Sequence, residues 1–232
     1  MPLFLWGFAA CGGSTPPTAS PSDEASQGDT AASGPMPQVS QELGSIDPNA
    51  VERTFDKLQG KIQGCYKTGL QRIEYLGGDV SVFLRIAQSG AVQYGYFEDS
   101  SVGDRETEKC ILGVLQAASW PKPIGGEAEV RKSFGFDPPD DVRAPTNWSS
   151  DKIAEAIGKA QSKIDDCKAG VSGTFKGAAY VVPDGKHGKV QAAGLAAPSK
   201  DGADKVDCLL GVVQGLELPS PGSYPAKVAL GL

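Results

Sequence analysis

The chain has 232 residues, 22% of them charged, and a formal net charge of −6. Its Lys residues are interleaved with Asp and Glu rather than gathered in a basic stripe with aromatic platforms, which argues against a nucleic-acid partner. No stretch approaches the roughly 20 apolar residues that a membrane-spanning helix needs. The composition therefore predicts a mildly acidic globular protein.

Residues 1–11 predict a lipoprotein export signal. A short apolar run ends in Phe8-Ala9-Ala10-Cys11, which resembles a bacterial lipobox, where small residues precede a cysteine that is acylated. Phe8 stands where leucine is usual and no basic residue precedes the run, so we expect the true start to lie upstream of Met1. The alternative is an apolar N-terminus with a free thiol at Cys11.

The next segment, residues 12–46, predicts a disordered tether. Gly, Ser, Thr, Pro, Ala and acidic residues follow one another there without apolar periodicity, so the segment cannot bury enough surface to offset its ordering entropy. If the lipobox is used, Gly12 after the anchor cysteine favours the outer membrane, with the folded part facing the periplasm.

The rest of the sequence contains an internal repeat. Cys110-Ile-Leu-Gly-Val-Leu-Gln116 matches Cys208-Leu-Leu-Gly-Val-Val-Gln214, and each continues to a Pro-x-Pro and a closing strand, at 130–136 and 227–232. In each copy an amphipathic helix precedes this segment, with apolar residues at the same intervals of 4, 3, 4 and 3. These positions are Val51, Phe55, Leu58, Ile62 and Cys65 in the first copy and Ile153, Ile157, Ala160, Ile164 and Cys167 in the second.

Between the two cysteines of each copy the sequence predicts a β-hairpin. Apolar residues alternate over 80–86 and 92–96 around Ser89-Gly90, and over 178–182 and 190–192 around Asp184-Gly185. The expected fold is α+β: two tandem domains, 47–137 and 149–232, joined by a linker over 138–148. Each domain is expected to follow the order helix, strand, strand, helix, strand and to form an antiparallel sheet. Asn49 and Glu52 predict a capping box at the first helix.

Four of the five cysteines fit this repeat. Cys65 and Cys110 both belong to apolar helical stripes that face one core, as do Cys167 and Cys208, so we predict the disulfides Cys65–Cys110 and Cys167–Cys208. The alternatives are free buried thiols or a metal site, but no Cys-x-x-Cys occurs and zinc sites need closely spaced ligand pairs. Cys11 is left without a partner.

No catalytic constellation is evident. The single histidine, His187, lies at a predicted hairpin tip, and the adjacent carboxylates Asp140-Asp141 and Asp165-Asp166 diverge rather than converge. We therefore expect no enzyme activity, no cofactor and no metal. Gly113 and Gly211, inside the helices that carry the second cysteines, are interpreted as room for close packing.

The segment 51–136 resembles the C-terminal domain named after the AgmX/PglI proteins of myxobacteria, a TonB/TolA-like module. The resemblance rests on Cys65-Tyr66, the strand 78–86, Gly90-Ala91-Val92, Cys110-Ile111 and Trp120-Pro121. The second copy keeps the frame but lacks the Tyr after Cys167 and the Trp before Pro219.

This resemblance implies protein–protein contacts in the bacterial envelope, in some members within motility or energy-transducing assemblies. With a lipid anchor in place of an inner-membrane helix, a passive adaptor for envelope proteins is the leading expectation. The candidate contact surface is the outer side of the first sheet, with Phe83, Tyr94, Tyr96 and Trp120 nearby; the alternative is that some of these aromatics fill the core. A small-ligand or cell-wall-binding lipoprotein is the alternative function.

Overall fold

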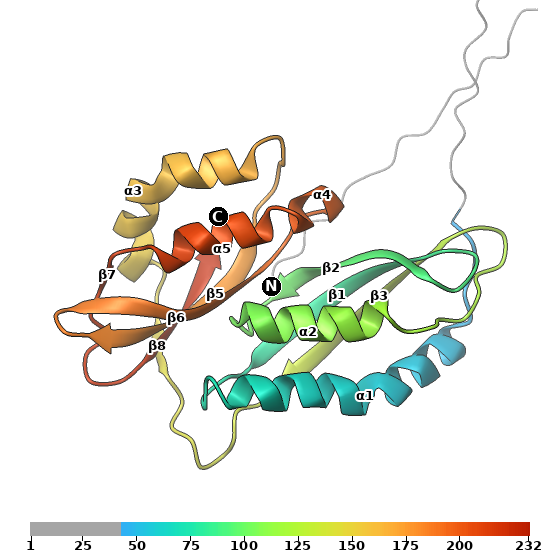
Figure 1. Cartoon of the computed structure of the whole chain (residues 1–232), viewed down its shortest axis with the longest axis horizontal. Coiled ribbons are helices and arrows are strands. Elements are labelled where there is room, and N and C mark those ends of the chain that lie inside the picture. The colour runs from blue at the N-terminus through green and yellow to red at the C-terminus, as the bar shows by residue number, and fades with distance from the viewer. Residues whose placement is uncertain (1–42) are drawn as a thin grey trace, which may run out of the picture. The chain divides into compact units, whose positions relative to one another are not determined.

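A computed structural model describes residues 43–232 (Figure 1), and these belong to one compact unit, Ser40–Leu232. Cys11, the lipobox and most of the expected tether lie outside the described residues. Among the residues that the structure describes, no helix combines the length and the apolar character needed to cross a membrane.

The chain is mixed α+β with two separate sheets. The elements are α1 (Pro48–Leu70), β1 (Gly78–Ile86), β2 (Val92–Ser100), α2 (Arg105–Gln116), β3 (Ala128–Phe136), β4 (Thr146–Trp148), α3 (Asp151–Lys168), β5 (Lys176–Asp184), β6 (His187–Ala196), α4 (Lys200–Ala203), α5 (Val206–Gln214), β7 (Leu218–Pro219) and β8 (Ala226–Gly231). We call residues 43–137 the first half and residues 146–232 the second half. Each half contains the expected order of helix, strand, strand, helix, strand, to which the second half adds β4, α4 and β7.

In the first half, α1 and α2 lie on one face of an antiparallel sheet with the strand order β2-β1-β3 (Figure 1). The β1 residues that face the helices are fully or almost fully buried: Val80, Val82, Leu84 and Ile86. The apolar stripe of α1 packs on them, as its spacing predicts. Tyr66 packs in this core, and its hydroxyl lies within hydrogen-bonding distance of the carbonyls of Leu76 (2.8 Å) and Asp137 (2.6 Å).

The second half has the sheet order β4-β8-β5-β6-β7, with α3 and α5 over its core. The hairpin and the closing strand are antiparallel as expected, whereas β4 pairs with β8 in parallel. Part of the expected linker 138–148 is therefore a strand. In the first half, the segment before α1 forms an isolated antiparallel bridge between Ser45 and Ile124, and Gly44 N–H donates to the carbonyl of Glu127 at 2.7 Å. The end of the expected tether is thus hydrogen-bonded to the first half.

Both predicted disulfides are present, Cys65–Cys110 and Cys167–Cys208. Each joins the end of the first helix of a half to its second helix. Only one cysteine of each pair lies in the core, since Cys65 and Cys167 are 4% and 8% exposed whereas Cys110 and Cys208 are exposed. The expectation that both cysteines of a pair point inward was wrong, because each bridge spans the solvent side of the contact between two helices.

Two further expectations need correction. The first helix is capped by Asp47, whose side chain accepts from Asn49 N–H at 2.9 Å, rather than by Asn49 itself. Gly113 and Gly211 are exposed, and a Cβ built on either would meet nothing within 4 Å. They therefore give no room to a neighbour. Close approaches occur at other glycines, among them Gly69, beside Thr107 and Leu76, and Gly194, beside Glu108.

Candidate functional site: the outer face of the first sheet

The face of the first sheet that points away from its helices carries a mixed aromatic and charged surface. Strand alternation places Phe83 and Arg85 of β1 there. Their cross-strand neighbours are Tyr96 and Arg131 beside Phe83, and Tyr94 and Glu129 beside Arg85. We call this set of six residues the outer face: Phe83, Arg85, Tyr94, Tyr96, Glu129 and Arg131.

Phe83 forms the centre of the outer face and is only 4% exposed. Its ring lies 5.1 Å from that of Tyr96 and 5.9 Å from that of Tyr94, and the guanidinium of Arg131 lies 4.6 Å above it. These neighbours remove the phenyl ring from water on a face that no helix of the first half covers. Phe83 therefore supports a platform on which Arg131 is the most exposed group and the two tyrosines are half-buried.

The charged groups of the outer face form ion pairs. Arg85 donates to Glu127 and Glu129, both at 2.8 Å, and Arg131 donates to Glu98 and Glu129 at 3.1 and 3.2 Å. The hydrogen bond from Arg85, followed by one from Gln93, lowers the pKa of Glu127. Burial, with the charge of Glu98 as a smaller cause, raises the pKa of Tyr96. These two arginines and three glutamates give the surface one net negative charge, and both guanidinium groups are held by ion pairs.

Trp120 does not belong to this surface, which corrects the grouping expected from the sequence. Its ring is 4% exposed and meets Phe55 edge-on at 4.7 Å inside the first core. Its indole N–H donates to the carbonyl of Leu115 at 3.1 Å. Tyr94, Tyr96 and Phe83 lie together as expected, whereas Trp120 lies on the helix side of the sheet.

The corresponding face of the second sheet is buried by the first half. Tyr180 of β5 is fully buried in the first core, and its hydroxyl lies 3.2 Å from both the N–H and the carbonyl of Gly77. The ammonium of Lys227 donates to the same carbonyl at 2.6 Å. Gly103 lies against Ala178, and Ala197 N–H donates to Phe97 at 2.9 Å. The other residues that β5 and β6 place against the first half are small: Ala178, Ala192, Gly194 and Ala196.

This contact between the halves was not predicted from the sequence. The feature of the sequence that could have indicated the contact is the weak apolar alternation of the second hairpin, in which Ala and Gly replace the large residues of the first. Small side chains on a sheet face allow another backbone to approach closely, so the pattern is explained by the first half lying on that face. This face is therefore covered, and the second half also reaches the outer face of the first sheet: the ammonium of Lys200 in α4 lies 4.7 Å from the ring centre of Tyr94, and Tyr96 packs against the second core.

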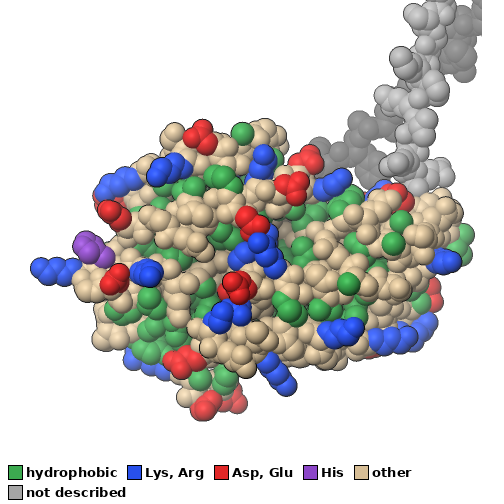
Figure 2. Space-filling model, in the orientation of Figure 1, with side chains coloured by type: hydrophobic (Ala, Val, Ile, Leu, Met, Phe, Trp, Pro, Cys, Tyr) green, Lys and Arg blue, Asp and Glu red, His purple; other side chains and the backbone are tan. Residues whose placement is uncertain are grey.

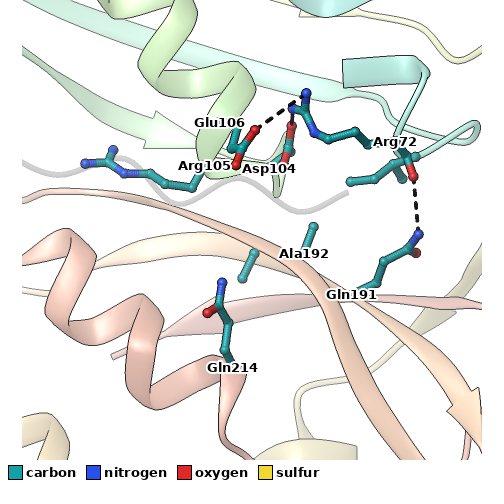
Figure 3. A pocket seen from close by; sticks show the side chains of 9 residues that line it. Arg72, Asp104, Arg105, Glu106, Gln191, Ala192 and Gln214 are labelled. Atoms are coloured by element: carbon teal, nitrogen blue, oxygen red, sulfur yellow. Dashed lines mark hydrogen bonds and ion pairs between the residues drawn. The ribbon is translucent and has the colours of Figure 1, made fainter. Parts of the chain in front are cut away.

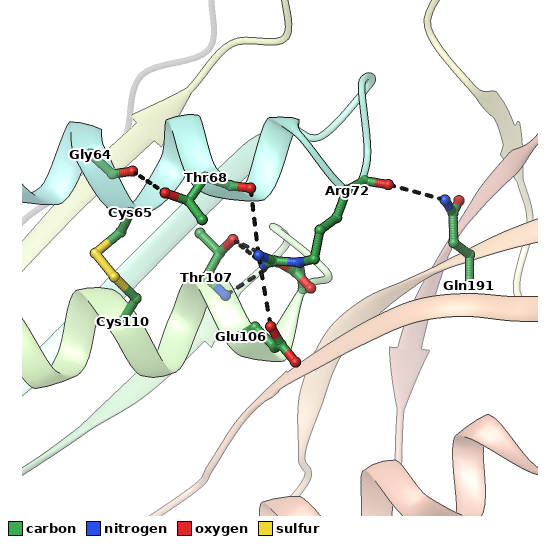
Figure 4. A network of polar contacts seen from close by, with 9 residues as sticks. Gly64, Cys65, Thr68, Arg72, Glu106, Thr107, Cys110 and Gln191 are labelled. Carbon is green, nitrogen blue, oxygen red and sulfur yellow. Dashed lines mark hydrogen bonds and ion pairs between the residues drawn. A yellow bond between two sulfur atoms is a disulfide. The ribbon is translucent and has the colours of Figure 1, made fainter.

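A cleft also lies between the halves (Figure 3). It has a volume of about 190 Å³ and is lined by the end of α1, the start of α2, β6 and the end of α5. The guanidinium of Arg72 lies at its rim, where it pairs with Asp104 and lies 3.3 Å from the Thr107 hydroxyl (Figure 4). The backbone carbonyl of Arg72 accepts from the side-chain amide of Gln191 at 3.4 Å. Arg105 turns to Asp207 at 2.8 Å. Both arginines of the cleft are therefore already paired with carboxylates.

On the face that presents α2 and α5, basic and acidic side chains lie side by side (Figure 2). The pairs Arg105–Asp207 and Lys109–Asp207, at 2.8 and 2.9 Å, join these two helices. His187 is exposed at the tip of the second hairpin, as predicted. Within residues 43–232, no group of three or more His, Cys, Asp or Glu side chains is arranged to hold a metal ion.

The chain matches no model of a known protein family, no curated protein and no solved structure. Its function is therefore argued from the residues and their geometry.

Proposed function

We propose that this protein is a non-enzymatic lipoprotein of the bacterial envelope that acts as a protein–protein adaptor. In this proposal Cys11 carries the lipid anchor at the outer membrane, and the two halves are tandem TonB/TolA-like modules facing the periplasm. The two disulfides support an oxidising compartment, since such bridges persist outside the cytosol. The common order of elements in the two halves supports the tandem arrangement.

The observation that carries the proposal is the outer face of the first sheet. Tyrosine and arginine are the residue types that dominate the energetics of protein interfaces, and here Tyr94, Tyr96 and Arg131 stand on a rigid sheet around Phe83. The pairing of Arg131 with Glu98 and Glu129 fixes its position before a partner arrives, which lowers the entropy cost of binding.

The free edge of the same sheet extends this surface. In the order β2-β1-β3, strand β3 lies at the edge, and the Gly44 segment reaches only its beginning, at Glu127. The remainder, from Arg131 to Phe136, has no strand beside it among residues 43–232. An extended partner segment can add there through main-chain hydrogen bonds, while its side chains reach the outer face.

The alternative, a small-ligand or cell-wall binder, would use the cleft between the halves. A second groove between the halves, lined in part by Tyr96 and Leu195, encloses about 330 Å³, whereas the cleft around Arg72 encloses about 190 Å³, below the roughly 300 Å³ at which ligand pockets begin. The two arginines of the cleft are also engaged by Asp104 and Asp207. We therefore prefer the adaptor function.

The proposal is tested by affinity capture from envelope extracts of the source organism. The bait is the full chain, compared with a Tyr94→Ala/Arg131→Ala variant of the outer face. A matched Lys57→Ala/Lys61→Ala variant changes two exposed residues of α1. We expect a defined protein to be recovered with the wild type and the α1 variant, and at least tenfold less with the outer-face variant. Recovery of glycan alone, or equal recovery with all three baits, would contradict the adaptor role.

A further inference from the structure

The contact between the two halves encloses an acidic side chain. Glu108, in the first turns of α2, is 0% exposed. Its Oε1 accepts from the Ser100 hydroxyl at 2.5 Å, and its Oε2 has no hydrogen-bond partner among the described residues. On the other side lies Gly194 of β6, where a Cβ would overlap the carboxyl group. The carboxyl is therefore sealed in by the second half.

The groups around this carboxyl offer it little charge compensation. From α2 and its cap, Arg105 and Asp104 act on it with opposite signs, and Arg105 is engaged by Asp207. Strand β2 contributes the Ser100 hydroxyl, and β6 contributes Gly194 and the Leu195 backbone, none of which titrates. A buried carboxylate without a cation is costly, whereas a neutral carboxyl in the same place costs much less.

We propose that Glu108 makes the contact between the two halves sensitive to pH, so that the halves hold together more firmly in a mildly acidic medium than at pH 8. The carboxyl is neutral while the halves are in contact and ionised when the contact opens and water reaches it. This device is independent of the adaptor role proposed above.

The direction of the pH dependence follows from the environment of the Glu108 carboxyl. Burial raises the pKa of Glu108 from 4.5 to about 7, against smaller opposing effects of Ser100 and Arg105. Below pH 4.5 the carboxyl is protonated whether the contact is closed or open, and the contact is at its strongest. Between pH 4.5 and 7 opening releases a proton, so the contact weakens as pH rises. Above pH 7 the full loss is reached, up to about 300-fold in the closing equilibrium, tenfold for each pKa unit.

One other ionisable group in the contact titrates in a different range. Burial lowers the pKa of Lys227 from 10.5 to about 8. This ammonium is charged in both the closed and the open state below pH 8, so it adds no pH dependence between pH 5 and 7.5. The pH range in which Glu108 titrates is therefore separate from that of Lys227.

The test follows the Ala197 amide, whose hydrogen bond to Phe97 joins the halves, by hydrogen exchange at pH 5 and pH 7.5 in the full chain. Protection factors remove the intrinsic pH dependence of exchange. We expect the protection of Ala197 to fall by between about tenfold and about 60-fold on raising the pH, and that of Ala179, inside the second sheet, to fall less. In Glu108→Gln we expect no fall, while Glu106→Gln, on the exposed side of α2, behaves as the wild type.

A second measurement covers the case in which Glu108→Gln does not fold. A carbon NMR titration of the Glu108 carboxyl in the wild type should give a midpoint near 7. A midpoint near 4.5, an unchanged protection of Ala197, or the same loss in Glu108→Gln would overturn the proposal. So would an equal loss at Ala179, because it would indicate a general loss of stability.

Discussion

Replacement of Tyr180 tests whether the two halves fold as one cooperative structure. Tyr180 belongs to the second sheet but is fully buried among residues of the first core. In Tyr180→Phe, the buried Gly77 N–H loses its partner, while the Gly77 carbonyl keeps the bond from Lys227. We expect a loss of about 1–3 kcal/mol in the free energy of unfolding. Tyr180→Ala also removes the ring and should cost about 3–5 kcal/mol.

Urea unfolding followed by fluorescence measures these losses in each half. Trp120 lies in the first core and Trp148 packs against the second, so Trp120→Phe and Trp148→Phe backgrounds, with Trp6 replaced in both, report the halves separately. With a slope of about 2 kcal/mol per molar urea, Tyr180→Ala should lower both midpoints by about 1.5–2.5 M. His187→Ala, at the tip of the same hairpin, should change either midpoint by less than about 0.3 M, because surface substitutions cost little. A shift confined to the Trp148 signal would refute a shared core.

Three further predictions concern the disulfides, the exposed glycines and an interface tyrosine. The Cys65→Ser/Cys110→Ser variant should lose about 4 kcal/mol of unfolding free energy, since the bridge closes a separation of 45 residues, and denaturant titration checks this. Gly211→Ala should stabilise by about 0.5–1 kcal/mol in the same assay, because its surroundings are open; a loss would contradict the geometry. Burial raises the pKa of Tyr75 to about 12, so stability should fall as pH rises from 10 to 12; thermal unfolding of Tyr75→Phe should show a smaller fall, since burial also raises the pKa of Tyr66, Tyr96 and Tyr180.

Periodicity and repetition predicted most of the local structure. The spacing of Val51 to Cys65 placed α1, the alternation around Ser89-Gly90 placed the first hairpin, and the matching cysteine segments predicted both disulfides. These features could be predicted because each depends on residues close in sequence or on a pattern that occurs twice.

What the sequence could not supply is the contact between the halves. Tyr180, Lys227 and Glu108 each contact a glycine of the other half, and no local pattern indicates which face of a sheet another segment will cover. The same limit explains the error at Trp120: a Trp before a proline has no strand phase, so nothing in its spacing assigns it to the core or to the outer face.

The most direct test of the adaptor proposal is site-specific photo-crosslinking in cells of the source organism. A photo-reactive amino acid is placed at Ser81 or Tyr94, on the outer side of the first sheet, and at Lys57 or Lys61 on the exposed side of α1. The proposal predicts that a defined envelope protein crosslinks from Ser81 and Tyr94 and not from the two α1 positions. Crosslinks from the α1 positions alone, or no protein adduct from Ser81 and Tyr94, would contradict it.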